Sequence, residues 1–355
     1  MVLQLSHLPS SLGPLAFSSY SKGVHLLRYF SKRLYSSSSE FDKLGQWDTQ
    51  LDFPLMEESS IKRGTPIPEI KVRDVGISSV IGRRNYQEDF YTIKQLRNNL
   101  LLLGVWDGHG GESCAKFCSE NVEKQLERLL ARTNEDDDLN LGLILSQLIY
   151  SLNHSFEVHW IKNKNNSSGS TATLALIHDG YELVIAHVGD SRAILCRDGV
   201  EKTLTLDHCP SRPDEKKRIK SLGGTVTADE IGRYLVNKRL SMSRSIGDFE
   251  LRRFGVISDP DITRLRIKHS KDQFLALVTD GVTFALSDKE IVETIKSFSE
   301  PQEAADRLVD QALLYGSEDN LTVLILPLGV WGKDQSKASN FFSLGRSLNN
   351  SYRFG

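Results

Sequence analysis

The spacing of apolar residues along this chain alternates between the period of a β-strand and the period of an α-helix. Short apolar runs such as 100–106 and 274–279 are bounded by polar residues or glycine and predict buried strands. Segments with apolar residues three and four positions apart, such as 112–132, predict amphipathic helices. Strands are expected at 75–81, 90–93, 100–106, 170–177, 181–188, 193–196, 274–279 and 321–326, and helices at 112–132, 139–162, 214–220, 287–298 and 301–315.

The order of these elements predicts the fold class. Strands come first, then two helices, several strands, further helices and a last strand. This order indicates an α+β domain, in which antiparallel sheets pack face to face and helices lie outside them. The strands 170–177, 181–188 and 193–196 are separated by short turns at Asp179-Gly180 and Gly189-Asp190, so we expect them to form an antiparallel meander.

The N-terminal residues differ from the rest of the chain. Residues 1–39 contain no Asp or Glu, are rich in Ser, and carry basic residues such as Arg28 and Arg33 beside an apolar helical stripe. This composition is typical of a mitochondrial transit peptide; a disordered Ser-rich tail is the alternative. Three prolines between 40 and 74 disfavour regular helix, so that segment is expected to be an extended arm. We therefore divide the chain into a transit peptide (1–39), an arm (40–74), a domain (75–328) and a C-terminal tail (329–355).

Composition narrows the classes of function. The 355 residues are 39% hydrophobic and 25% charged, which is typical of a globular protein, and the net charge of −2 gives no electrostatic basis for binding nucleic acid. No apolar run approaches the ~20 residues that span a bilayer. The four cysteines are too few for a disulfide scaffold, and we expect Cys114 and Cys118 to pack in a helix rather than to bind zinc.

Acidic residues lie at the ends of several predicted strands. Asp107 and Asp280 each follow a buried strand and precede a glycine, and Asp319 comes just before the last strand. Each alone is also compatible with a plain turn. If the chain brings them together, carboxylates repel one another unless divalent cations hold them. Oxygen ligands favour Mg²⁺ or Mn²⁺ over Zn²⁺, and two such ions would form a hydrolytic centre.

Further polar residues accompany these acids. His109 can transfer a proton, and Gly108 leaves its own carbonyl free to approach a ligand closely. Glu88 and Asp89 follow two arginines between strand-like runs, so they form either a second part of the site or a charged hairpin tip. Asp190 is another acid at the end of a strand.

Seven short motifs occur in one order between about 75 and 326. They are Arg84…Glu88-Asp89, Asp107-Gly108-His109-Gly110-Gly111, Ser168-Gly169-Ser170-Thr171-Ala172, Val188-Gly189-Asp190-Ser191-Arg192, Ser243-Arg244-Ser245-Ile246-Gly247-Asp248, Thr279-Asp280-Gly281 and Glu318-Asp319-Asn320. In this order they resemble the metal-dependent protein phosphatases of type 2C. The resemblance implies a sandwich of two antiparallel sheets flanked by helices on both sides. It also implies two Mn²⁺ or Mg²⁺ ions per subunit, with phosphoserine and phosphothreonine in proteins as substrates.

The resemblance also implies a role for each matching residue. Asp107 matches the carboxylate that bridges both ions, Asp280 and Asp319 match ligands of one ion, and the carbonyl of Gly108 matches a ligand of the other. The remaining matches are Glu88 and Asp89 as ligands directly or through water, Arg84 as the phosphate-binding residue, His109 as the general acid, and Asp190 as a ligand of a weak third ion. Phe284 stands where the family often has a further Asp, which argues against a full third site.

Three segments resemble the mitochondrial branch of this family: 60–68, 214–220 and 329–333. This implies a matrix enzyme that acts on the phosphorylated subunit of the branched-chain 2-oxoacid dehydrogenase complex. One alternative is the same enzyme class acting on other matrix or cytosolic phosphoproteins. Another is a non-catalytic binding module with this fold, which the presence of Arg84, His109 and the acids disfavours.

Overall fold

The computed structural model describes residues 70–96, 99–132, 140–162, 167–329 and 331, which belong to a single unit assigned to Ile67–Gly355. The predicted transit peptide, the arm up to residue 69 and nearly all of the predicted C-terminal tail lie outside the described residues. Ile70 and Val72, which the sequence assigned to the arm, pack against the hydrophobic core. Val72 belongs to a short 3-10 turn, η1 (Val72–Asp74), that leads into the first strand.

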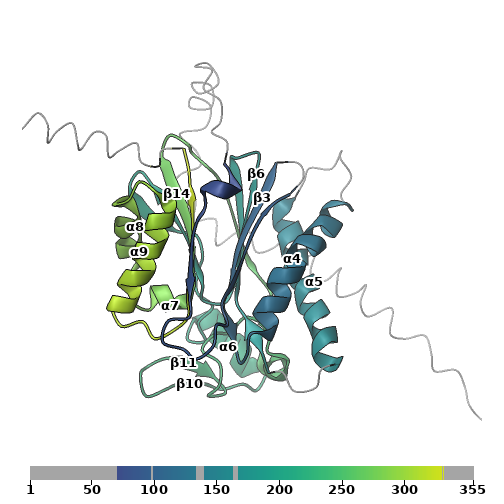
Figure 1. Cartoon of the computed structure of the whole chain (residues 1–355). Helices are drawn as coiled ribbons and strands as arrows, with labels where there is room; N and C mark the ends of the chain where they lie inside the picture. The colour runs from purple at the N-terminus through teal and green to yellow at the C-terminus, as the bar shows by residue number, and fades with distance from the viewer. Residues whose placement is uncertain (1–69, 97–98, 133–139, 163–166, 330, 332–355) are drawn as a thin grey trace, which may run out of the picture. The chain divides into compact units, whose positions relative to one another are not determined.

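Two five-stranded antiparallel sheets form the centre of the fold (Figure 1). Sheet I has the order β1 (Gly76–Val80), β15 (Leu321–Pro327), β14 (Asp272–Val278), β8 (Arg192–Arg197) and β9 (Val200–Thr203). Sheet II has the order β13 (Asp261–Arg266), β7 (Glu182–Val188), β6 (Ala172–His178), β3 (Leu100–Trp106) and β2 (Phe90–Gln95). All of the pairings in both sheets are antiparallel.

Helices cover the outer face of each sheet. The helices α4 (Ser113–Leu130) and α5 (Leu141–Lys162) pack on sheet II, and α8 (Asp288–Lys296) and α9 (Pro301–Leu314) pack on sheet I (Figure 1). Ser287 caps α8 in a capping box with Glu290. The predicted α+β sandwich with helices on both sides is therefore confirmed. No helix in the described ranges is long and apolar enough to cross a membrane.

The position of β3, which is covered on both faces, explains why its sequence is continuously apolar. Leu101, Leu103 and Val105 face the core between the two sheets, whereas Leu102 and Trp106 face the core beneath α4 and α5. Since alternate side chains of a strand point to opposite faces, a strand that is covered on both faces needs apolar residues at every position. This packing fixes the end of β3, and with it the position of Asp107.

The predicted meander is wrong at its second turn. The strands β6 and β7 do form a hairpin, with Asp179 and Gly180 in the left-handed region at φ 50° and 73°. The chain then crosses from sheet II to sheet I at Gly189, which has a φ of 109°, and β8 pairs with β14 and β9. Both sheets bury apolar faces, so the apolar pattern of β8 does not reveal which sheet it joins.

Several short elements lie around the ends of the sheets. A small sheet has the order β12 (Ile246–Gly247), β5 (Gly169–Ser170) and β4 (Gly108–His109). Others are α6 (Pro213–Ser221), the hairpin β10 (Val226–Ala228) and β11 (Tyr234–Val236), the 3-10 helix η2 (Phe249–Phe254) and α7 (Asp280–Thr283). The strands β4, β9, β10, β11, β12 and β13 were not predicted from the sequence.

Candidate active site

Three aspartates from distant parts of the chain meet at one end of the sheets. Carboxylate oxygens of Asp107, Asp190 and Asp280 all lie within 4.8 Å of one another. Asp107 follows β3 of sheet II, Asp280 follows β14 of sheet I, and Asp190 lies where the chain crosses between the sheets. Among the described residues, no other group of three or more His, Cys, Asp or Glu side chains is placed to share one metal ion.

Hydroxyl groups connect the backbone segments that carry Asp107 and Asp190. Thr171 donates its backbone N–H to the carbonyl of Asp107 at 2.8 Å, and the N–H of Asp107 donates to Thr171 Oγ1 at 3.0 Å. The same Oγ1 lies 2.8 Å from Ser191 Oγ, in the residue after Asp190. Because both hydroxyls are buried, these bonds fix the two aspartates relative to one another.

Burial and the charges of neighbouring carboxylates raise the pKa values of all three aspartates. Burial, followed by the charges of Asp280 and Asp89, raises the pKa of Asp107 well above its usual range. Burial and the charge of Asp280 raise the pKa of Asp190 to about 8, and burial and the charge of Asp319 raise the pKa of Asp280. Three carboxylates at this spacing are costly unless cations or protons neutralise them.

The donors present fit a divalent cation. Oδ1 of Asp190 is buried and has no hydrogen-bond partner among the described residues. All ligand atoms in the group are carboxylate oxygens, as Mg²⁺ and Mn²⁺ prefer. A group of partly buried, mutually repelling carboxylates, one of which has a buried oxygen without a donor, is matched in charge and chemistry by a divalent ion.

Asp319 lies beside this group of three rather than within it. Arg84 Nη2 donates to Asp319 Oδ2 at 2.7 Å, which holds a half-exposed guanidinium next to the acids. Asn320 supports the loop that carries Arg84, because its Nδ2 donates to the carbonyls of Ile81 and Tyr86 at 2.8 and 3.0 Å. Its Oδ1 accepts the N–H of Glu88 at 2.8 Å.

Gly108 and Glu88 pack closely against one another. A Cβ atom at position 108 would overlap the carbonyl oxygen of Glu88, so this approach requires glycine. The Glu88 side chain turns back and accepts the N–H of Gly111 through Oε1 at 3.1 Å. The Glu88 side chain is thereby tied to the segment 108–111, which directly follows Asp107.

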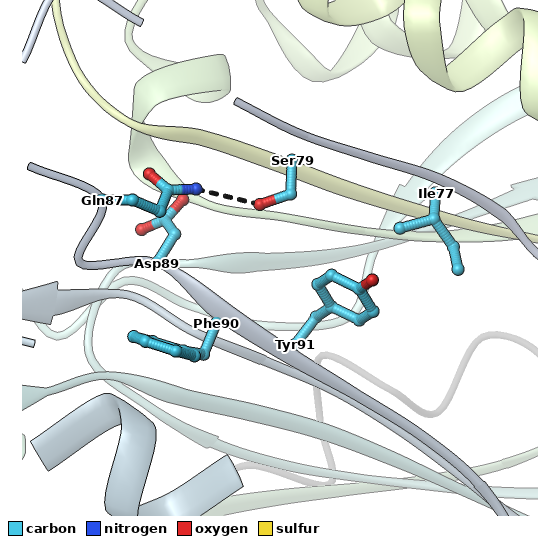
Figure 2. A pocket seen from close by; sticks show the side chains of 6 residues that line it. All are labelled: Ile77, Ser79, Gln87, Asp89, Phe90 and Tyr91. Carbon is cyan, nitrogen blue, oxygen red and sulfur yellow. Dashed lines mark hydrogen bonds between the residues drawn. The ribbon is translucent and has the colours of Figure 1, made fainter. Parts of the chain in front are cut away.

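Asp89 lies at one end of a groove between β1 and β2, the neighbouring edge strands of the two sheets (Figure 2). The groove has a volume of about 750 Å³ and is lined by Ile77, Ser79, Gln87, Asp89, Phe90 and Tyr91. Burial raises the pKa of Asp89 to about 7, although Thr279 Oγ1 donates to its Oδ2 at 2.9 Å. Figure 2 shows Gln87 and Asp89 together at one end and Tyr91 and Ile77 towards the other.

His109 is paired with an acid to which the sequence assigned no role. Its Nε2 lies 2.7 Å from Oδ2 of Asp248, which is buried. Burial lowers the pKa of His109, but the charge and hydrogen bond of Asp248 outweigh it, so the pKa is raised above its usual value. The pKa of Asp248 is lowered, because His109 and Ser245 overcome the opposing effect of burial. Nδ1 of His109 is buried without a partner among the described residues.

Residues 73–321 match the family model for "Protein phosphatase 2C". The chain belongs to the protein phosphatase 2C family. It is 42% identical to "Protein phosphatase 1K, mitochondrial" of Xenopus laevis over 86% of this chain and 82% of that protein. It is 34% identical to "Protein phosphatase 1L" of Bos taurus over 73% of each chain.

Two solved structures share the fold of this chain. A serine-threonine phosphatase 2C from Toxoplasma gondii superposes with a TM-score of 0.63 and 24% identity, covering 74% of this chain and 96% of that one. A C. elegans sex-determining protein gives a TM-score of 0.67 with 22% identity, covering 90% and 76%. The chain is accordingly a metal-dependent protein serine/threonine phosphatase, and the acidic group fits the divalent metals that the family uses.

Several residues that build this phosphatase site lie in the motifs but carried no assigned role. Thr171, Ser191, Asn320 and Asp248 act through hydrogen bonds between segments far apart in sequence. The only feature of the sequence that could have identified these residues was their position next to the glycines and acids of the motifs. Adjacency does not show which atoms meet, because that depends on how the two sheets pack.

Proposed function

We propose that this protein phosphatase 2C acts in the mitochondrial matrix, with two Mn²⁺ or Mg²⁺ ions per subunit. Its proposed substrate is the phosphorylated subunit of the branched-chain 2-oxoacid dehydrogenase complex. The observation that carries the catalytic proposal is the group of partly buried, mutually repelling carboxylates at Asp107, Asp190 and Asp280. The address and the substrate rest on the sequence resemblances and on the relative that is named mitochondrial.

The metal ligands are proposed residue by residue. Asp107, Asp280, Asp319 and the carbonyl of Gly108 hold the two ions; Glu88 and Asp89 contribute directly or through water, and Asp190 belongs to a weak third position. A carboxylate oxygen of Asp190 lies within 4.8 Å of those of Asp107 and Asp280, which gives Asp190 more weight than the sequence alone did. Divalent ions bound by such a site acidify a water molecule and stabilise charge on the phosphoryl group.

Two side chains of the protein act on the phosphate ester itself. Arg84 binds the phosphate oxygens, for which a planar guanidinium is suited, and its bond to Asp319 keeps it beside the acids. His109 donates a proton to the departing oxygen, because a serine or threonine alkoxide is a poor leaving group. With Nε2 engaged by Asp248, the proton leaves from Nδ1 of the protonated ring.

The metal-centred proposal is tested with Asp280→Ala. On a phosphothreonine peptide with Mn²⁺ present, this variant should lose turnover, and EDTA should inactivate the unaltered protein. Asp310→Asn on the outer helix α9 removes one exposed acid and serves as the matched control. Near-normal turnover by Asp280→Ala would remove Asp280 from the ligands, and activity that survives EDTA would contradict the metal mechanism.

The address and the division of the chain are tested separately. We propose that 1–39 is a transit peptide, 40–74 an arm, 75–328 the phosphatase domain and 329–355 a tail. A fluorescent reporter fused to 1–39 should enter mitochondria, and the same fusion with Arg28 and Arg33 replaced by Glu should not. Diffuse cytosolic fluorescence of the first fusion would refute the proposed mitochondrial localisation.

The substrate is tested by trapping. Asp280→Ala, incubated with mitochondrial extract, should retain the branched-chain 2-oxoacid dehydrogenase complex in its phosphorylated form. The matched control is the same extract treated beforehand with a phosphatase of another family. Retention of other matrix phosphoproteins without this complex would favour the alternative substrate.

A further inference from the structure

The pair formed by His109 and Asp248 is built by three separate segments of the chain. In the small sheet, β5 is the middle strand, and Gly169 of β5 stands opposite His109 on one side and Gly247 on the other. His109 and the residue after Gly247 therefore reach each other across Gly169. A Cβ atom at position 169 would overlap both Asp248 Oδ2 and His109 Nε2, so the pair occupies the space that a side chain there would take.

Asp248 is held in an uncommon backbone conformation. Its φ of 47° and ψ of 38° are left-handed, a region that non-glycine residues seldom adopt. Arg252 secures the preceding residues by donating to the carbonyls of Gly247 and Ser245 at 3.0 and 2.9 Å. Ser245 Oγ donates to Asp248 Oδ2 at 2.6 Å, on the same oxygen that faces His109.

We propose that Asp248 is a positioning residue of the phosphatase, which fixes the ring of His109 with Nε2 bound and Nδ1 directed to the reacting phosphate ester. This rests on the proposed role of His109 as general acid. The carboxylate accepts the Nε2 proton and so selects the orientation and the tautomer of the ring, as the partners of catalytic histidines do in general. Nδ1, which has no protein partner among the described residues, is left for the leaving oxygen.

The variant Asp248→Gly removes the carboxylate, and glycine accepts the left-handed backbone without strain. General acid catalysis contributes roughly 10²- to 10⁴-fold and matters most for a poor leaving group. We expect kcat on a phosphothreonine peptide to fall by about 10- to 100-fold with little change in KM. The loss on p-nitrophenyl phosphate, whose leaving group needs no proton, should be at least about tenfold smaller.

Two further variants make the result specific. Asp248→Asn keeps an acceptor oxygen and tolerates positive φ, so it should recover part of the activity that glycine loses. Asp179→Gly removes an exposed Asp at φ 50° in the β6–β7 turn and is the matched control. Equal losses of Asp248→Gly on both substrates, or no loss on the peptide, would overturn the proposal.

The same measurements on His109→Gln separate this proposal from the one on which it rests. If His109→Gln loses as much activity on p-nitrophenyl phosphate as on the peptide, His109 is not the general acid. If His109→Gln loses more activity on the peptide than on p-nitrophenyl phosphate and Asp248→Gly does not, His109 keeps its role and the inference about Asp248 fails. Nitrogen-15 NMR of the metal-free protein gives a readout independent of turnover: a neutral His109 should carry its proton on Nε2, and a proton on Nδ1 would contradict the assignment.

Discussion

Removal of divalent cations should make the stability of this phosphatase fall as the pH rises. Carboxylate oxygens of Asp107, Asp190 and Asp280 lie within 4.8 Å of one another, and two unit charges at that distance repel by about 3.5 kcal/mol at an effective dielectric constant of about 20. Without cations, the folded protein relieves the cost of burial and this repulsion by binding protons, so burial and the charge of Asp280 raise the pKa of Asp190 to about 8.

The sign follows from the two states of the protein. The folded pKa of Asp190 lies above the ordinary value of 3.8, so between these values the folded protein holds more protons than the unfolded one. Its contribution to stability is therefore complete below about pH 4 and is lost as the pH rises through about 8. At about 1.4 kcal/mol per pH unit, the loss between pH 5.5 and 8 is about 3 kcal/mol, or about 6–12 °C in Tm for a domain of this size.

The assay is thermal unfolding followed by circular dichroism in EDTA, at pH 5.5 and pH 8. Asp190→Asn should show a smaller drop in Tm than the unaltered protein, and Asp310→Asn should show the same drop. His109, with its raised pKa, also lowers stability as the pH rises, whereas His187 and His208, with lowered pKa values, act in the opposite direction. These histidines are present in all three proteins, so the difference between them isolates Asp190.

Adding Mn²⁺ at pH 8 should raise the Tm of the unaltered protein by more than it does at pH 5.5, because protons compete with the cation for the carboxylates. An equal drop in Tm for Asp190→Asn and the unaltered protein would refute the reasoning that burial and the neighbouring carboxylates raise the pKa of Asp190 in the folded state.

Three other predictions concern catalysis and folding. Arg84→Gln removes the guanidinium that is proposed to bind the phosphate, so it should raise KM for a phosphothreonine peptide by about tenfold or more, since a charged hydrogen bond of about 1.5–3 kcal/mol is lost. Steady-state kinetics at saturating Mn²⁺ measures this, and an unchanged KM would argue against phosphate binding by Arg84. Glu215 is fully buried and accepts hydrogen bonds from Arg218 and Arg244 at 2.7 and 2.8 Å. Glu215→Ala should therefore destabilise the fold by about 3–5 kcal/mol in urea unfolding. Glu293→Ala, at an exposed position of α8, should change the free energy of unfolding by less than about 0.5 kcal/mol. Ser287→Ala should cost about 1 kcal/mol in the same assay by removing the N-cap of α8, and a stability equal to that of the unaltered protein would mean that the capping box contributes nothing.

The apolar pattern identified the central strands and helices because each of them buries a regular face. The run at β3 and the periodic segments at α4, α5 and α9 are long enough for their period to be unambiguous. The pattern missed β13, whose residues are mostly partly exposed and include Arg264 and Arg266. It also placed β8 in a meander with β7, because a buried strand looks the same in either sheet.

The site was predictable in composition but not in its internal connections. Asp107 and Asp280 were identifiable as acids before a glycine at the ends of apolar strands, and the motif order related them to a family. The structure places Asp190 with them and Asp319 beside Arg84, an arrangement that depends on how the two sheets are aligned. Asp248 was least predictable, since its partner His109 lies 139 positions away and the contact passes over a glycine.

The crossing of the chain at Gly189 has a consequence for partly unfolded molecules. The three acids are supplied by sheet I, by sheet II and by the crossing between them, so a cation bound there acts as a cross-link between the two halves of the sandwich. Local opening of either sheet separates the ligands and releases the cross-link. A molecule in which one sheet has opened therefore lacks the complete site and should be inactive.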